Sequence, residues 1–324
     1  MKKKLNIFVY IIIILSLISV SLLYSVFRYS PFFYLQNQTK EPVYFGATFM
    51  TMNNPFFEVI NEEIEKEIHQ RGDVLYTLDP ALNVEKQLEH INMLIDKGID
   101  VLFVNPIDNT QFHEVLLKCK EKGIIVIAVD TNLNKNDYVS YTVVSDNYMA
   151  GVLAAKDMML QKESAQIVLL EHSQTISGSL RIQGFVDTIS NNPNYQIVAR
   201  KECEGQLENA MPCVFSLLDQ NISFDVIMAL NDPSALGALA ALQDYGKTDV
   251  LVYGVDGTPE CKVLIQDGKM RATSAQSPYS IGQESVKAAY SLLEGKNFTE
   301  TVKKIPVQLI TEENINQFSL TGWQ

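Results

Sequence analysis

The sequence is poor in the features that mark most catalytic and nucleic-acid-binding proteins. Its 324 residues contain 26 Lys and Arg against 38 Asp and Glu, and a net charge of −12 excludes the basic footprint of a nucleic-acid-binding protein. There is no G-x-G-x-x-G fingerprint, no P-loop and no G-x-S-x-G nucleophile elbow. The four cysteines and four histidines match no zinc-binding spacing. These absences predict a protein that is not an enzyme and that uses no metal or cofactor.

One long uncharged run stands near the start of the chain. Residues 7–27, IFVYIIIILSLISVSLLYSVF, carry no charge and are long enough to cross a hydrocarbon core of about 30 Å. Lysines at positions 2–4 precede the run, so the positive-inside rule places the N-terminus in the cytoplasm and the remainder outside. We expect residues 1–41 to form a cytoplasmic tip, a transmembrane anchor and a stalk. The protein would then be a single-pass protein of the cell membrane.

A cleaved signal peptide is the alternative for the same run. Its apolar region is typically about 7–15 residues and ends at a small-x-small site. The run here is longer, and the Ser-Val-Ser at 19–21 is a poor cleavage site. The sequence therefore favours an uncleaved anchor.

From Val43 onward, strand-like and helix-like segments alternate. Apolar, β-branched runs such as VLFV at 101–104 are separated by helical stretches such as 54–71 and 84–97. This alternation is typical of parallel sheets covered by helices on both faces. About eleven such strands exceed one comfortable sheet, so the expected fold class is α/β with two doubly wound lobes.

Polar residues follow several of these strands, where ligands bind in open parallel sheets. They are Asn105, Asp130, Glu171, His172, Asn231 and Asp256. In the Asn231-Asp232-Pro233 stretch, we expect Asp232 to cap the next helix and Pro233 to occupy its first position. That assignment leaves Asn231 free for a ligand.

The stretch TMNNPFFEV at 51–59 raises a question about two adjacent rings. Asn54 and Pro55 suit the cap and first position of a helix. Neighbouring helical residues point about 100° apart, so Phe56 and Phe57 cannot both lie at the centre of one apolar stripe. The stripe continues at positions 60, 64 and 68 and centres near Phe57. This leaves Phe56 at the edge of the stripe, with no partner assigned by the pattern.

A set of motifs, in order and spacing, resembles type I periplasmic binding proteins, closest to the ribose-binding group, from Val43 to about Leu309. The motifs are NNPFF at 53–57, VDTN at 129–132, SDN at 145–147, SLRIQGF at 179–185, NDPSALGALAAL at 231–242, GVDGTP at 254–259 and AQSPYSIG at 275–282. The resemblance implies two lobes joined by a three-strand hinge, with a sugar between them. The implied lobes are 42–144 plus 277–303 and 145–276 plus 304–324.

The resemblance also implies the residues that bind the sugar. The matching positions are Asn54, Phe56, Phe57, Asp130, Ser145, Arg181, Asn231, Asp256 and Gln276. Sugar hydroxyls both donate and accept, which suits an acceptor such as Asp, a donor such as Arg and amides that do both. Aromatic rings suit the apolar face of a pyranose. The core of lactose-repressor-type regulators is similar, but a regulator needs a helix-turn-helix where this chain has its apolar run.

Two positions depart from the ribose-binding pattern. Thr131 stands where an arginine is usual, and Gly205 stands where an aromatic residue is usual. Both changes free volume, so we expect a hexose or a substituted sugar as the ligand. The alternative is that Gly205 only permits a turn with positive φ and another residue walls the site.

The resulting hypothesis is a membrane-anchored, extracytoplasmic sugar-binding protein that closes on a monosaccharide and delivers it to an ABC-type transporter. A ligand-presenting sensor subunit for a membrane histidine kinase is the alternative, and the sequence does not separate the two. Cys203 and Cys213 are the only cysteines close in sequence. An extracytoplasmic location permits a disulfide between them, and four small buried thiols are the other interpretation.

Overall fold

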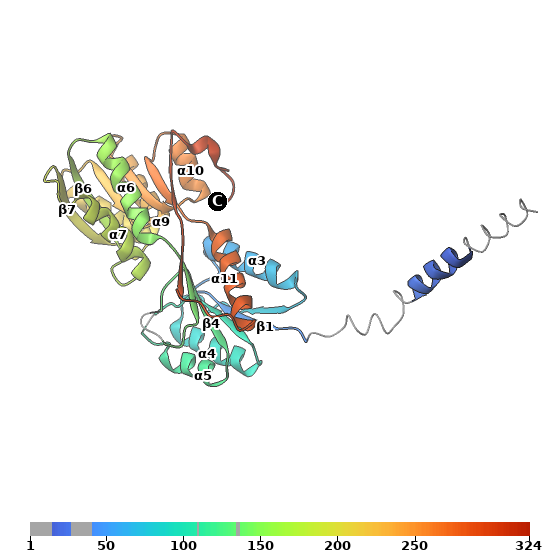
Figure 1. Cartoon of the computed structure of the whole chain (residues 1–324). Helices are drawn as coiled ribbons and strands as arrows, with labels where there is room; N and C mark the ends of the chain where they lie inside the picture. The colour runs from blue at the N-terminus through green and yellow to red at the C-terminus, as the bar shows by residue number, and fades with distance from the viewer. Residues whose placement is uncertain (1–14, 27–40, 109, 134–136) are drawn as a thin grey trace, which may run out of the picture. The chain divides into compact units, whose positions relative to one another are not determined.

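The computed structural model describes residues 15–26, 41–108, 110–133 and 137–324. Residues 15–26 form an exposed helix, and the remainder of the predicted membrane segment lies outside the described residues. Within those ranges, no helix is both long enough and apolar enough to cross a bilayer. The chain divides into Met1–Val43 and Tyr44–Gln324, and the second unit contains the sheets (Figure 1).

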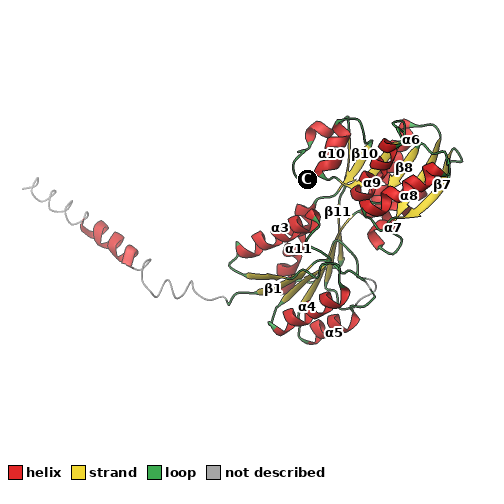
Figure 2. Ribbon diagram, turned by 180° about the vertical axis from the view of Figure 1, so that it is seen from behind, coloured by secondary structure: helices red, strands yellow, loops and turns green. Residues whose placement is uncertain are grey.

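Two sheets, each with its own helices, form the unit from Tyr44 onward (Figure 2). The first sheet contains β1 (Tyr44–Thr48), β2 (Val74–Thr77), β3 (Val101–Val104), β4 (Ile125–Val129), β5 (Tyr141–Ser145) and β11 (Val302–Ile305). The second contains β6 (Ala165–Glu171), β7 (Tyr195–Glu202), β8 (Val226–Ala229), β9 (Leu251–Asp256), β10 (Ala272–Ala275) and β12 (Gln308–Thr311). Their orders, β11-β5-β4-β3-β1-β2 and β12-β10-β9-β8-β6-β7, repeat one topology.

Helices cover both faces of each sheet. The first lobe has α3 (Pro55–His69), α4 (Val84–Asp96), α5 (His113–Glu121) and α11 (Pro278–Leu293). The second lobe has α6 (Asn147–Gln161), α7 (Ile176–Ile189), α8 (Leu207–Asp219), α9 (Asp232–Asp244), α10 (Pro259–Gln266) and the short η1 (Ile315–Gln317). In the first lobe α3 packs on α11 and α4 on α5, and in the second α6 packs on α7 and α8 on α9. The predicted α/β fold with two doubly wound lobes is confirmed.

The strands are buried because their sequences are apolar on both faces. All residues of β3 and of β8 are buried, as continuous VLFV and VIMA runs require when helices cover both sides. Neighbouring strands are parallel, except that β12 pairs antiparallel with β10. All four cysteines are free thiols, and Cys203 donates to Ser234 Oγ at 3.3 Å, so no bond joins it to Cys213.

The chain passes between the sheets at three places. It crosses from β5 to α6, from β10 to α11 and from β11 to β12. The first two crossings follow the carboxyl ends of strands, at Ser145 and at Gln276. Two predicted ligand residues therefore lie where the lobes are connected. The residue boundaries predicted for the lobes stay a prediction.

Two glycines let α6 and α7 approach closely. A Cβ at Gly151 would collide with the backbone carbonyl of Arg181, and one at Gly184 would collide with the backbone carbonyl of Tyr148. The close approach lets Arg181 Nε donate to Asn147 Oδ1 at 2.8 Å. The helix crossing thus fixes the position of a predicted ligand residue.

We predict that Gly151→Ala and Gly184→Ala each lower the free energy of unfolding by about 1–3 kcal/mol, because the helices must separate. Urea denaturation measures this change. Lys156→Ala, on the exposed side of α6, serves as the control and should change stability by less than about 0.5 kcal/mol. Alanine favours helix over glycine, so a stabilised Gly151→Ala variant would contradict the close crossing.

Candidate ligand-binding site

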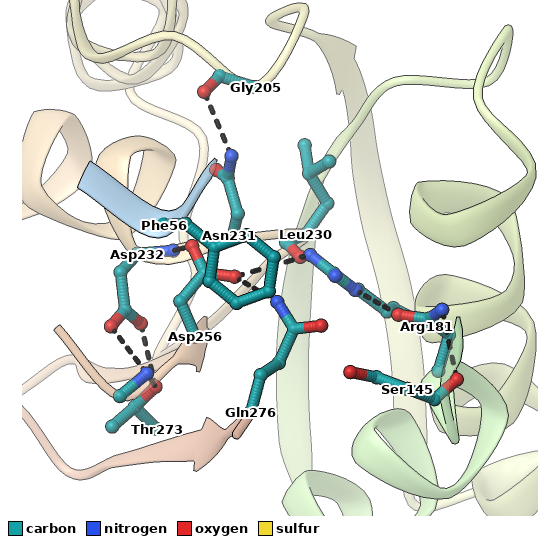
Figure 3. A network of polar contacts seen from close by, with 12 residues as sticks. Phe56, Ser145, Arg181, Gly205, Leu230, Asn231, Asp232, Asp256, Thr273 and Gln276 are labelled. Atoms are coloured by element: carbon teal, nitrogen blue, oxygen red, sulfur yellow. Dashed lines mark hydrogen bonds and ion pairs between the residues drawn. The ribbon is translucent and has the colours of Figure 1, made fainter. Parts of the chain in front are cut away.

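Polar side chains from both lobes gather at the carboxyl ends of the strands (Figure 3). Asp130 follows β4 and Ser145 ends β5 in the first sheet, while Asp256 ends β9 and Gln276 follows β10 in the second. Arg181 on α7 interacts with both lobes, because its positive charge lowers the pKa of Asp130 from the first and of Asp256 from the second. The structure therefore brings together the predicted residues that follow the central strands.

The Arg181 guanidinium is buried among acceptors. The residue is 6% exposed, its Nε donates to Asn147 Oδ1 at 2.8 Å, and its Nη1 donates to the Leu230 carbonyl oxygen at 3.0 Å. Nη1 also lies 3.6 Å from Asp256 Oδ1 (Figure 3). These contacts come from α6, β8 and β9, so the guanidinium has a fixed orientation before any ligand binds.

The Asp256 carboxylate is shared between protein partners. Its Oδ1 accepts from Gln276 Nε2 at 2.7 Å, and its Oδ2 accepts from the Asp232 backbone N–H at 3.4 Å. Burial raises the pKa of Asp256 to about 7, with Arg181 lowering it and Asp232 raising it. Burial likewise raises the pKa of Asp130, and Arg181 again lowers it. The site thus holds two carboxyl groups whose ionisation is opposed by burial.

The expectation that Asp232 caps α9 is wrong, because the cap is Asn231. Asn231 is the cap of α9, because its Oδ1 accepts from the Ser234 backbone N–H at 3.0 Å and from Ser234 Oγ at 2.6 Å. Asp232 is fully buried and accepts from the backbone N–H groups of Gly257 at 3.0 Å and Thr258 at 2.8 Å. Gly257 and Thr258 directly follow β9 in the sequence. Their backbone N–H groups donate to the Asp232 carboxylate, which therefore does not cap α9.

Gly205 has the positive φ that the alternative interpretation expected. Its φ is +71°, and a Cβ there would lie 3.0 Å from Asn231 Nδ2, which donates to the Gly205 carbonyl oxygen at 2.9 Å. The loop before α8 is therefore built around glycine and cannot accept a ring without strain. Together with its capping bonds, this contact leaves Asn231 little capacity for a ligand.

Three predicted ligand residues carry a buried polar atom without a hydrogen-bond partner among the described residues. These atoms are Asp130 Oδ1, Ser145 Oγ and Gln276 Oε1. Their residues are 7%, 2% and 2% exposed, respectively. Buried polar groups are nearly always hydrogen-bonded, so an orphaned cluster calls for a partner from outside the chain. Asp130 also has a φ of +64°, a conformation that is uncommon for residues other than glycine, although Asp adopts it more readily than most.

The two phenylalanines are both buried, and they contact different aromatic partners. Phe57 stacks on Phe49 in the core, with ring centroids 6.0 Å apart. Phe56 is 5% exposed and meets Phe57 edge-to-face at 5.7 Å. Its other neighbour is the indole of Trp323, at 5.4 Å. Asn54 is exposed and caps α3, accepting from the Phe56 N–H at 3.0 Å, so it positions this ring.

Sequence reasoning missed Trp323. Of the polar residues expected at strand ends, Asn105, Glu171 and His172 make other contacts. Trp323 is the only tryptophan in the chain, and that rarity was the one available signal. Asn105 is fully buried and ties strands together, since its Nδ2 donates to the Val129 carbonyl oxygen at 3.0 Å. Glu171 and His172 line a separate cavity of about 190 Å³ with Arg200, and none of the predicted ligand residues lines that cavity.

Comparisons with known proteins cover the part of the chain that holds the candidate site. Residues 45–297 match a family model described as a periplasmic binding protein domain. The ribose import binding protein of Salmonella typhimurium is 32% identical over 262 residues, covering 80% of this chain and 86% of the relative. Every predicted ligand residue, from Asn54 to Gln276, falls within the matched segment.

Solved structures agree with the two-lobed fold. The periplasmic binding protein of the arabinose ABC transporter from Shewanella sp. ANA-3, bound to L-arabinofuranose, has a TM-score of 0.80 at 25% identity, covering 85% of this chain and 94% of that one. The Caulobacter myo-inositol binding protein, bound to myo-inositol, has a TM-score of 0.77 at 26% identity, covering 87% and 97%. Both lobes of this chain are therefore matched.

The raised pKa of Asp256 predicts a pH dependence of stability. The unfolded pKa is about 3.9 and the folded pKa is about 7, so the folded state holds this proton more tightly. The contribution of Asp256 to stability is present below about pH 4 and is lost as the pH rises to about 7. We expect the Tm of the ligand-free protein to fall more between about pH 5 and pH 8 than that of Asp256→Asn, measured by calorimetry.

The exposed Asp244 provides the control for this comparison. Asp244→Asn should keep the pH dependence of the unmodified protein. Parallel Tm curves for the unmodified protein and Asp256→Asn would contradict the assigned protonation.

Proposed function

The chain belongs to the periplasmic binding protein family, and on that premise we propose that it binds a monosaccharide outside the cytoplasm and delivers it to an ABC-type importer. The relatives described above are named for the import of ribose or arabinose or for the binding of myo-inositol. These compounds share a compact ring that bears several hydroxyl groups. A ligand of that class is what the site residues are equipped to hold.

The observation that carries the proposal is the cluster of orphaned atoms around Arg181. Gln276 Oε1 can only accept, Asp130 Oδ1 only accepts when its carboxyl is ionised, and Ser145 Oγ can do both. Hydroxyl groups on neighbouring ring carbons donate to such acceptors and accept from a guanidinium, so one polyol satisfies several buried groups at once. Charge-assisted hydrogen bonds of this kind are the stronger ones.

The proposed ligand set contains all the predicted residues, but only some of them contact the ligand directly. Asp130, Ser145, Arg181, Asp256 and Gln276 contact hydroxyl groups. Phe56 packs on the apolar face of the sugar, while Asn54 and Phe57 hold Phe56 in place. Asn231 shapes the loop at Gly205 through the contact at 2.9 Å.

A ligand larger than a pentose, either a hexose or a substituted sugar, fits the residues beside Asp130. Thr131 is 8% exposed, and its Oγ1 accepts a hydrogen bond from Asn105 Nδ2 at 3.4 Å. Its short side chain is therefore turned toward the strands. The position therefore supplies neither a positive charge nor bulk toward the ligand. Transport is favoured over a sensor role because the relatives are import proteins by name.

The uncharged run supports membrane anchoring as a further part of the proposal. An anchored binding protein stays close to its membrane partner, which raises the effective concentration of the pair. The described helix at 15–26 is rich in apolar side chains that are exposed. A bilayer would cover such side chains.

Calorimetric titration of the full chain in detergent tests the sugar assignment. The panel is D-ribose, L-arabinose, D-allose, D-galactose, D-glucose and myo-inositol. We expect at least one to bind, and a hexose or inositol to bind more tightly than D-ribose. If none binds at millimolar concentration, the proposed function is wrong, and tightest binding of D-ribose would refute the size argument.

Asp130→Asn should weaken binding of the preferred sugar about tenfold to a hundredfold, because a charge-assisted bond worth about 1.5–3 kcal/mol is lost. Asparagine tolerates the φ of +64° at this position, so the fold should survive. Asp244→Asn, with an exposed side chain, is the matched control. Equal affinities in all three proteins would move the site away from Asp130.

We expect cells that express the full chain to retain it in the membrane fraction. Mass spectrometry of that fraction should find peptides that include residues 7–27. A shorter protein released into the medium, lacking these residues, would identify the run as a cleaved signal.

A further inference from the structure

A short segment near the end of the sequence lies against the candidate site. Residues 319–324 follow β12 and η1, and Gln324 returns to the strand ends of the second sheet. Its Nε2 donates to the backbone carbonyl oxygens of Asp256 at 3.1 Å and Gln276 at 2.5 Å. The segment is therefore held directly beside two residues of the proposed ligand set.

A buried lysine holds the same segment from the second lobe. Lys262 on α10 is fully buried, and its Nζ donates to the Gly322 carbonyl oxygen and, at 3.3 Å, to Gln324 Oε1. A buried ammonium group is costly unless it is hydrogen-bonded, so these acceptors satisfy Lys262 as much as Lys262 fixes them. Both neighbours of Trp323 in sequence are thus fixed to the lobe.

Between these anchors, the Trp323 indole reaches the other lobe. Its ring meets Phe56 of α3 at a centroid distance of 5.4 Å and an interplanar angle of 65°, the edge-to-face geometry that aromatic pairs favour. Trp323 is only partly buried. It therefore combines a fixed backbone, contact with the proposed sugar-facing ring, and surface that remains available.

No ring comes from the loop at Gly205, because its φ of +71° and the nearby Asn231 amide exclude a larger side chain. Trp323 also lies beyond residues 45–297, the segment that matches the family model. The family model therefore does not cover the indole.

We propose that Trp323 determines ligand specificity by forming, together with Phe56, the aromatic wall against which the apolar face of the sugar packs. The inference rests on the proposed sugar-binding function. A tryptophan side chain buries a large apolar area and carries an N–H donor at its edge, so it selects ring size as well as hydroxyl position. Because the wall is built from both lobes, a sugar that contacts it also holds the lobes together.

The test uses the full chain in detergent and the same sugar panel. Trp323 is the chain's only tryptophan, so tryptophan emission reports this position alone. The sugar that binds tightest to the unmodified protein should shift this emission and reduce its quenching by acrylamide. Unchanged emission and quenching at saturation would overturn the proposal.

Trp323→Ala should weaken calorimetric binding of that sugar about tenfold or more, with a smaller loss for the weakest-bound sugar, so that discrimination shrinks. The affinity of Trp323→Phe for that sugar should lie between those of the unmodified protein and Trp323→Ala. Gln324→Ala keeps the indole but removes three hydrogen bonds that hold the segment, so it should reproduce part of the loss. Tyr245→Ala removes an exposed ring at the end of α9 and should bind like the unmodified protein.

The outcomes separate this inference from the proposed function. Unchanged affinities and ranking in Trp323→Ala, while the unmodified protein binds sugar, would overturn the role of Trp323 alone. Tighter binding by Trp323→Ala would also overturn it, because the indole would then be competing with the sugar. Absence of sugar binding by the unmodified protein would overturn the proposed function and this inference together.

Discussion

The burial of one guanidinium group is the constraint on which the candidate site depends. A buried charge is tolerated only with good partners, and Arg181 has acceptors from α6, from the end of β8 and from β9. To reach them, α7 must cross α6 at the distance that Gly151 and Gly184 allow. The backbone carbonyl that faces Gly151 belongs to Arg181 itself, so helix packing and site geometry are set by the same contact.

The repeated sheet topology explains why residues so distant in sequence meet around this group. Each sheet presents its strand ends toward the connections between the lobes, and two of those connections begin at Ser145 and Gln276. Asp130 and Asp256 follow or end the equivalent strands β4 and β9 of the two sheets. A carboxylate from each lobe thus lies within the electrostatic reach of one arginine.

The sequence predicts the parts of this arrangement that local rules determine. The apolar strands, the helix starts at Asn54 and Pro55, and the separate roles of Phe56 and Phe57 follow from periodicity and capping. The roles of Asn231 and Asp232 did not, because the partners that capture Asp232 are amides 25 and 26 residues away. Capping preference alone cannot distinguish two adjacent cap-forming side chains when a distant loop competes for one of them.

Trp323 was beyond prediction for a related reason. Its neighbours in sequence show no periodicity, and the resemblance to known motifs ends before it. Its position depends on Lys262 and on the backbone of Asp256 and Gln276, contacts that span 48 to 68 residues. The return of residues 319–324 to the carboxyl ends of β9 and β10 is therefore visible only in the folded lobe.

The electrostatics of the candidate site link ligand binding to the protonation of its carboxyl groups. Burial raises the pKa of Asp256 to about 7, although Arg181, 3.6 Å away, lowers it; the neighbouring Asp232 raises it further. Hydroxyl groups that donate to a carboxylate favour its ionised form and lower its pKa. Under the proposed function, a bound sugar therefore supplies the hydrogen-bond donors that the protein interior withholds from Asp256 and Asp130. The buried acceptors that lack a protein partner are then, on this proposal, the source of affinity for a molecule with several hydroxyl groups.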